Sequence, residues 1–281
     1  MIDHTIVGWD GSAQADLAVE WATQHVTGRT DSLRIVRTVD DTALYSDETE
    51  ARWAVDVATF AVAELAARVR LAHPQLAVTT VVTRGEPGDV LAEMSEPNSL
   101  LVVGSEDGHP SDDWYSARLG VRLAAAARGA VAIIPMGDGL DRHGVLVGVD
   151  ESDAALSQCF FAAELASRYN ESLHAVRACS KYLTPASSTV EGPDTADRAA
   201  LDAFLAPVAQ AFPAVHIVAH VEYRSPVTAL LDRAGRAAFV VVGARRPGTV
   251  RRLLLGSVSR ALVTNARCPV VVVTPQTEPG S

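Results

Sequence analysis

The sequence lacks the features that mark membrane, secreted and disulfide-stabilised proteins. No apolar run approaches the ~20 residues that a membrane-spanning helix needs. A strand pattern begins almost at the N-terminus and leaves no room for a signal peptide. The three cysteines, Cys159, Cys179 and Cys268, stand too far apart for a disulfide framework or a metal motif. We therefore expect a soluble protein of the cytoplasm.

Positive charge and catalytic motifs are also scarce. The formal net charge of −10 argues against a general nucleic-acid binder. The imbalance lies in the first half, because residues 1–140 carry 21 acidic and 10 basic side chains, whereas residues 141–281 carry 13 and 14. The sequence has no nucleophile elbow, no H-E-x-x-H pair and no Walker loop. We therefore predict no catalytic residue, no protein-held metal and at most slow turnover.

An internal repeat spans the chain. Five segments recur 139 or 140 residues later: Thr5–Ser12 as Val145–Ser152, Leu33–Val39 as Leu173–Cys179, Arg84–Pro87 as Tyr223–Pro226, Ser99–Gly104 as Ala238–Gly243, and Val131–Ile134 as Val270–Val273. Near-constant spacing over five segments indicates duplication. The 281 residues also favour two domains. We place them at 1–137 and 142–281, with a short linker near 136–143.

Each copy alternates apolar strand patterns with amphipathic helix patterns. The first copy predicts strands near 4–9, 32–38, 77–83, 99–103 and 130–134, and helices near 13–27, 48–72, 87–96 and 116–127. The second predicts strands near 144–149, 172–178, 214–221, 238–242 and 269–273, and helices near 153–169, 194–211, 226–235 and 257–265. Polar stretches at 39–47 and 180–194 are interpreted as surface loops.

This alternation predicts an α/β fold of two tandem doubly wound domains. Each would hold a five-stranded, mostly parallel sheet of order 3-2-1-4-5, with helices on both faces and right-handed crossovers. Such sheets bind ligands outside the carboxyl ends of their strands. Asp10, Gly104, Asp150 and Gly243 all end strands and are expected at that edge.

The stretch from Phe239 to Asn265 has the features of an anion site. A buried strand ends at Gly243, a loop with four arginines follows (Arg245, Arg246, Arg251 and Arg252), and Gly256-Ser257 opens a helix. The free N–H groups and positive dipole end of such a helix attract anions, and arginine forks fit phosphate oxygens. A helix-capping Ser257 beside a solvated basic loop is the simpler alternative, but the combination favours phosphate.

These motifs resemble those of universal stress proteins. The GWDGS and GVDES segments after the first strands and the Gly243-x2-Arg246-x9-Gly256-Ser257 pattern carry the resemblance, which covers nearly the whole chain as a tandem form. Nucleotide-binding members of that family carry G-x2-G-x9-G-[ST] and bind ATP. The resemblance implies that Asp150 lies near the ribose and adenine, and that the glycine loop and helix start hold the phosphates.

The resemblance and the arginine-rich loop together imply a full set of site residues and partners. The cofactor-binding residues would be Val149, Asp150, Ala178, Gly243, Arg245, Arg246, Gly256, Ser257, Val258 and Ser259. The cofactor would be ATP with Mg²⁺, and the role regulation or sensing in a stress response. Two chains would form a homodimer through their last strands, where apolar runs at Val131–Ile134 and Val270–Val273 would be a liability if left unpaired.

One departure in the second copy leaves alternatives open. Arg246 replaces the second glycine of the family pattern, and glycine permits a close backbone approach that arginine does not. The side chain could block the phosphates, or its fork could replace the backbone contacts, which the neighbouring arginines favour. The runner-up function is an interaction protein that binds no nucleotide, and a third is a slow ATP hydrolase.

The first copy departs further. The interval from Gly104 to Gly120 is three residues longer than that from Gly243 to Gly256, and Val121 replaces the serine. Its loop carries Glu106, Asp107, Asp112 and Asp113. Like charges about 4 Å apart repel by ~1 kcal/mol even in water. We predict that the first domain does not bind ATP in the usual way; its acidic loop could hold a divalent cation or a basic partner, although a surface loop is the simpler interpretation.

His216 and His220 are the remaining candidates. Both would lie on one face of a strand, about 13 Å apart. That separation is too large for one metal ion, so we interpret them as packing or surface residues.

Overall fold

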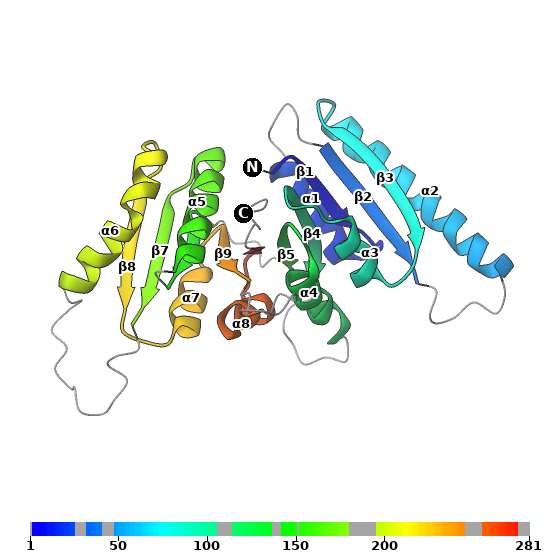
Figure 1. Cartoon of the computed structure of the whole chain (residues 1–281). Helices are drawn as coiled ribbons and strands as arrows, with labels where there is room; N and C mark the ends of the chain where they lie inside the picture. The colour runs from blue at the N-terminus through cyan, green and yellow to red at the C-terminus, as the bar shows by residue number, and fades with distance from the viewer. Residues whose placement is uncertain are drawn as a thin grey trace, which may run out of the picture. The chain divides into compact units, whose positions relative to one another are not determined.

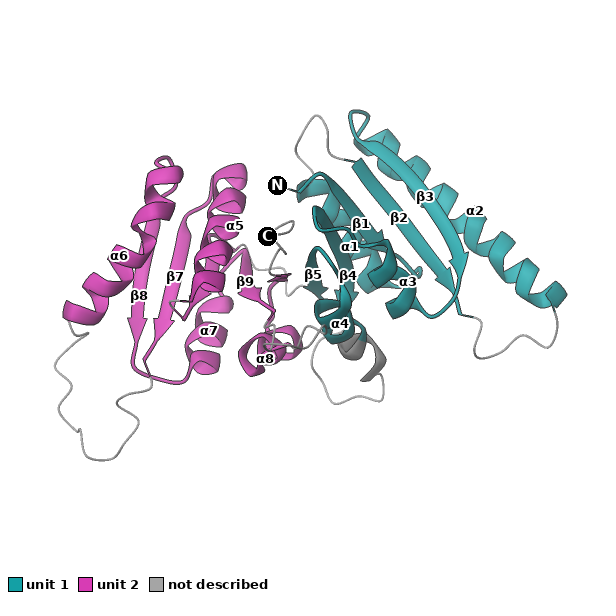
Figure 2. Ribbon diagram, viewed as in Figure 1, with its two compact units in different colours: residues 1–136, 246–254, 276–281 teal, residues 137–245, 255–275 magenta. Residues whose placement is uncertain are grey.

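The structure, a computed structural model, describes residues 2–25, 32–40, 48–105, 114–136, 142–150, 152–179, 195–244 and 255–274. The chain divides into two compact units (Figure 2). Of the described residues, unit 1 contains those up to 136, and unit 2 contains those from 142 to 244 and from 255 to 274. The acidic loop at 106–113, the arginine-rich loop at 245–254, and most of the linker and of the two polar stretches lie outside the described residues.

Unit 1 is a five-stranded parallel sheet with helices on both faces (Figure 1). Its elements are β1 (His4–Gly8), α1 (Ala13–His25), β2 (Ser32–Val39), α2 (Glu48–Ala72), β3 (Ala77–Arg84), α3 (Pro87–Met94), β4 (Ser99–Ser105), α4 (Trp114–Ala126) and β5 (Ala130–Pro135). The strand order is β3-β2-β1-β4-β5, and each pairing is parallel. Helices α3 and α4 contact each other on one face.

Unit 2 repeats this arrangement. Its elements are β6 (Val145–Val149), α5 (Asp153–Tyr169), β7 (Leu173–Ala178), α6 (Thr195–Ala211), β8 (Ile217–Glu222), α7 (Pro226–Ala234), β9 (Phe239–Gly243), α8 (Ser257–Asn265) and β10 (Val270–Val273). The order β8-β7-β6-β9-β10 is again parallel throughout. The predicted fold class and strand order are therefore confirmed in both units.

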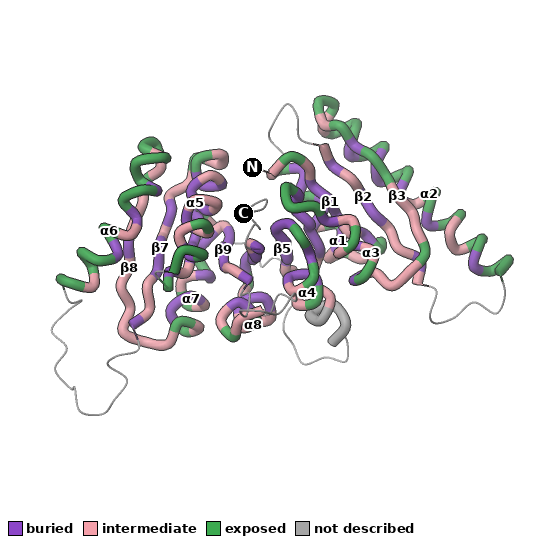
Figure 3. The backbone as a smooth tube through the Cα atoms, in the orientation of Figure 1, coloured by how far each residue is buried: buried purple, intermediate pink, exposed green. Residues whose placement is uncertain are grey.

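The core of each unit lies between the sheet and its helices. Residues 100–103 of β4 and 239–242 of β9 are buried, as expected for strands covered on both faces. Figure 3 shows the inner strands largely buried, whereas the outer strands β3 and β8 and the outer sides of the helices are more exposed. Helix α2 exposes large apolar side chains: Trp53 and Phe60 are each 67% exposed. Among the described helices, none combines the length and apolar character that crossing a membrane requires.

All three cysteines are buried, and none of them forms a disulfide. Cys159 and Cys268 are 0% exposed and Cys179 is 7% exposed. Burial, with a smaller contribution from the charge of Asp150, raises the pKa of the Cys159 thiol to about 12. Cys268 is enclosed in the core of unit 2.

The strand-ending glycines allow a helix to approach the sheet closely. A Cβ on Gly104 would lie 2.3 Å from the backbone oxygen of Gln14 and 2.9 Å from the backbone nitrogen of Ala15, in the first turn of α1. A Cβ on Gly243 would lie 2.0 Å from the side-chain nitrogen of Gln158 on α5. Gly104 is therefore required by the fold itself, before any ligand is considered, whereas Gln158 is a flexible side chain that can move away from Gly243.

Replacing Gly104 should destabilise unit 1. The backbone of α1 cannot move aside as a flexible side chain can, so Gly104→Ala is expected to lower the free energy of unfolding by about 1–3 kcal/mol. Denaturant unfolding followed by circular dichroism measures this. Gly235→Ala is the control, because its Cβ would meet nothing closer than 3.9 Å and its φ of −59° suits alanine. An equal loss in both variants would contradict the steric argument.

Candidate functional site

In unit 2, an aspartate is held at the carboxyl end of β6 by the start of the next helix. Asp150 Oδ1 accepts hydrogen bonds from the backbone N–H of Ser152 at 3.2 Å and from its hydroxyl at 2.6 Å. Ser152 Oγ in turn accepts the N–H of Ala155 at 3.1 Å and so caps α5. The Asp150 carboxylate is thus oriented by the fold while the residue remains exposed.

The same turn occurs in unit 1. Asp10 Oδ1 accepts the N–H of Ser12 at 2.9 Å, and Ser12 Oγ accepts the N–H of Ala15 at 3.2 Å. The two Asp-x-Ser turns therefore match in geometry as well as in sequence, and each couples an exposed carboxylate to the start of a crossover helix.

The predicted binding residues of unit 2 that the structure describes gather at one edge of the sheet. Val149 ends β6, Ala178 ends β7 and Gly243 ends β9. Because β6 pairs in parallel with both β7 and β9, these three residues lie side by side next to Asp150. Arg245 and Arg246, predicted to clamp the phosphates, lie outside the described residues.

Helix α8 begins at this edge without a side-chain cap. Its N-cap is Gly256, and no side-chain hydrogen bond of the described residues closes its first turn. By contrast, Ser152 caps α5 and Ser225 caps α7. The first-turn amides of α8, on Ser257 and the two residues after it, are consequently placed to receive an external acceptor.

The serines of this turn have different environments. Ser257 is exposed, whereas Ser259 is 6% exposed and its hydroxyl donates to the Gly243 carbonyl at 2.7 Å. That hydrogen bond ties the first turn of α8 to the end of β9 and occupies the hydroxyl proton of Ser259. Ser259 can therefore offer a ligand its backbone N–H more readily than its hydroxyl.

Among the described residues of unit 1, no helix starts at the position equivalent to Gly256. Helix α4 already begins at Trp114, so Gly120 and Val121 lie inside it rather than at its first turn. Amides in a helix interior bond to the carbonyl four residues earlier. The expectation that this domain does not bind ATP in the usual way also used the loop charges at 106–113, which lie outside the described residues, and it stays a prediction.

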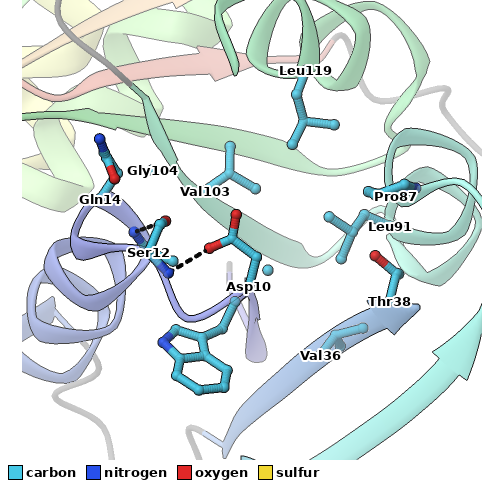
Figure 4. A pocket seen from close by; sticks show the side chains of 13 residues that line it. Asp10, Ser12, Gln14, Val36, Thr38, Pro87, Leu91, Val103, Gly104 and Leu119 are labelled. Carbon is cyan, nitrogen blue, oxygen red and sulfur yellow. Dashed lines mark hydrogen bonds between the residues drawn. The ribbon is translucent and has the colours of Figure 1, made fainter. Parts of the chain in front are cut away.

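In unit 1, a cavity of about 340 Å³ lies beside Asp10 (Figure 4). Residues from β1, β2, β4, α1, α3 and α4 line it, and they include Leu119 from the part of α4 that has no counterpart in α8. Sequence reasoning did not find this cavity, because its walls come from six separate elements.

A pair of histidines was also missed. His220 on β8 stacks on His174 of β7 with ring centroids 5.4 Å apart, and the facing nitrogens are separated by 3.1 Å. His174 Nε2 lies 2.9 Å from Ser172 Oγ. His216, predicted on the same strand as His220, precedes β8, which begins at Ile217. Among the described residues, no group of three His, Cys, Asp or Glu side chains could hold a metal ion.

Comparisons with known proteins agree on one family. The model of the universal stress protein family matches residues 1–134 and again 142–274. A universal stress protein of Mycobacterium tuberculosis is 31% identical over 284 residues, which cover 95% of each chain. The crystal structure of a universal stress protein from Archaeoglobus fulgidus has a TM-score of 0.75 at 18% identity and covers 97% of this chain and 98% of its own. A shorter universal stress protein solved in complex with cAMP covers 47% of this chain at 27% identity and a TM-score of 0.37.

The histidine pair should make unit 2 sensitive to mild acid. Burial, the charge of Arg233 and the neighbouring His174 together lower the pKa of His220 to about 4, and burial with Arg233 also lowers the pKa of His174. Between pH 6.5 and 4 the unfolded chain takes up protons that the folded chain does not. The free energy of unfolding should therefore fall as the pH falls through this window.

Other ionisable groups near these two rings also contribute to the pH dependence of the free energy of unfolding. They are Glu222 on β8, Arg198 on α6, Glu171 before β7 and His216 before β8. Denaturant unfolding of wild type and His220→Gln at several pH values separates the pair from this background. The variant should lose less stability than wild type on acidification, and identical pH profiles would contradict the assignment.

Proposed function

The chain belongs to the universal stress protein family, and we propose on that basis that its second unit binds an adenine nucleotide, ATP with Mg²⁺. The observation that carries the proposal is the uncapped first turn of α8, which opens at the same sheet edge as Asp150. A helix start of this kind attracts phosphate through its free amides and its dipole.

On the phosphate side, the backbone rather than the side chains of α8 makes the main contacts. The N–H groups of Ser257, Val258 and Ser259 point out of the helix start, and Gly256 permits close approach. The exposed Ser257 hydroxyl adds a donor. Arg245 and Arg246 precede this turn in the sequence and would neutralise phosphate charge.

On the sugar side, the Asp150 carboxylate accepts hydrogen bonds from ribose hydroxyls. Its orientation is set by Ser152 before any ligand binds, which lowers the entropy lost on binding. Val149 and Ala178 end the neighbouring strands and flank the base. Mg²⁺ would arrive with the nucleotide, held by phosphate oxygens and water, since this ion commonly uses few protein ligands.

The described site offers geometry for binding and little for chemistry. The carboxylate and the helix start can hold a nucleotide at both ends, which suits regulation or sensing in the cytoplasm. We therefore propose a regulatory role in a stress response rather than turnover.

Calorimetric titration with ATP and Mg²⁺ tests the site. Wild type should release or absorb heat saturably, and Asp150→Ala should weaken binding about tenfold or more, since a hydrogen bond to a charged group contributes ~1.5–3 kcal/mol. Asp10→Ala is the matched control, because it removes the same turn in unit 1 and should leave the ATP affinity unchanged.

A further variant addresses the phosphate side. Gly256→Glu places a carboxylate at the N-cap of α8, where it would occupy the amides and repel phosphate, so binding should be lost. Absence of any heat with wild type at millimolar ATP would contradict the proposal and favour an interaction protein without a nucleotide.

We also propose that two chains associate through their last strands. Light scattering coupled to size-exclusion chromatography should then give twice the chain mass of 29.7 kDa. A particle mass of one chain at micromolar concentration would contradict this pairing.

A further inference from the structure

We propose that the outer face of α2 in unit 1 pairs with the same face of a second copy of this chain, so that the two helices run antiparallel. Four large apolar side chains are exposed on this helix: Trp53 and Phe60 at 67%, Val57 at 47% and Leu71 at 84%. An exposed apolar surface that extends along an element is typical of an interaction site. The contact uses neither the last strands nor the proposed nucleotide site.

The exposed side chains are spaced as in a coiled coil. With two further exposed residues they recur at alternating intervals of four and three positions, which is the spacing of helices that pack along one another. This α2 seam consists of Trp53, Val57, Phe60, Glu64, Ala67 and Leu71. The buried residues of α2, such as Val62 and Val69, lie on the opposite side of the helix, which packs on β2 and β3. The seam therefore faces away from the core (Figure 3).

The second copy of the repeat shows that the fold does not need these side chains. Helix α6 follows β7 as α2 follows β2, and its residues stand 139 positions after those of α2. The core is kept under this spacing, because Val62 and Val69 correspond to the buried Leu201 and Val208. From Val57 onwards, the seam residues correspond to Ala196, Ala199, Ala203, Ala206 and Gln210. Packing within a unit therefore does not explain the large apolar side chains of the α2 seam.

The charges along α2 make the helix complementary to itself in the antiparallel direction. Its first turns carry an excess of acidic groups, and its last turns carry only basic ones. These are Glu48, Glu50, Arg52 and Asp56 near the start, and Arg68 and Arg70 near the end. An antiparallel pair sets each acidic end against a basic end and opposes the two helix dipoles. A parallel pair would instead place Glu64 against Glu64 of the other copy, where like charges repel.

One register pairs every position of the seam. Trp53 of each chain then faces Leu71 of the other, and the positions between them face each other as Val57 with Ala67 and Phe60 with Glu64. Two-fold symmetry makes each contact occur twice. Removing the two aromatic rings from water favours the pair. A polar residue in such a seam lowers stability, so we expect Glu64 to keep the association weak.

Sedimentation equilibrium of the full chain over a range of concentrations tests the pairing. The average mass of wild type should rise towards twice that of the species present in dilute solution. The triple variant Val57→Ala, Phe60→Ala and Leu71→Gln gives α2 the residues that α6 carries, and it should weaken this association about tenfold or more. Its free energy of unfolding in dilute solution should match that of wild type, because the replaced side chains are exposed.

A substitution on another side of α2 is the matched control. Thr59 is exposed and lies about a third of a turn around the helix from the seam. Thr59→Ala should therefore associate as wild type does.

Cysteine cross-linking tests the direction of the helices, since the native thiols are buried. Trp53 and Leu71 stand 18 positions apart, which is ~27 Å along a helix. In an antiparallel pair, neither Trp53→Cys alone nor Leu71→Cys alone brings two introduced thiols together. A mixture of the two variants does, and it keeps the other Trp53–Leu71 contact. Under mild oxidation only the mixture should give a disulfide-linked species of two chains in electrophoresis without reductant.

The outcomes distinguish this contact from the others. A wild-type mass that stays constant up to millimolar concentration, or equal association of wild type and the triple variant, would overturn the pairing. A lower free energy of unfolding in the triple variant would also count against it, because the side chains would then serve packing within unit 1. Cross-linking of either single variant as readily as the mixture would overturn the antiparallel arrangement. The mass of one chain in dilute solution would reject only the pairing through the last strands.

Discussion

The amides in the first turn of a helix need acceptors, and this requirement distinguishes the two units. Side chains meet it at α1, α3, α5 and α7, through Ser12, Glu86, Ser152 and Ser225. At α8 the N-cap is a glycine that can offer no such group. Helix α4 begins earlier, at Trp114, so the equivalent amides lie inside the helix and bond to carbonyls of its own backbone. In the site proposed for unit 2, the attraction of an anion would follow from where α8 begins.

The residues of the proposed site in unit 2 also connect its strands to its helices. Asp150 positions Ser152, which caps α5, and Ser259 joins α8 to the last residue of β9. Gly243 accepts that bond and also makes room for Gln158 on α5. The residues nearest the proposed ligand are thus the same ones that connect strands to helices. A duplicated chain can change the chemistry of one copy only by altering loops and helix starts around this shared frame.

Much of the architecture could be predicted because it depends on local periodicity and on a repeat. The strand order and nearly every element boundary followed from apolar runs, and the expected helix at 116–127 already enclosed Gly120. The histidine pair could not be predicted, since it depends on the register between β7 and β8. The cavity beside Asp10 needs Leu91 and Leu119 to converge from different helices. The hydrogen bond that engages Ser259 is a tertiary contact with no sequence signature.

Because every native cysteine is buried, the motions of this molecule can be studied by labelling cysteines introduced on its surface. A buried thiol reacts slowly with labelling reagents because the reagent cannot reach it, and the Cys159 thiol is in addition hard to ionise. A single cysteine introduced on the surface of either unit would therefore carry a dye or spin label without prior removal of the native ones. Paired labels of this kind would allow the separation between the two halves to be followed in solution.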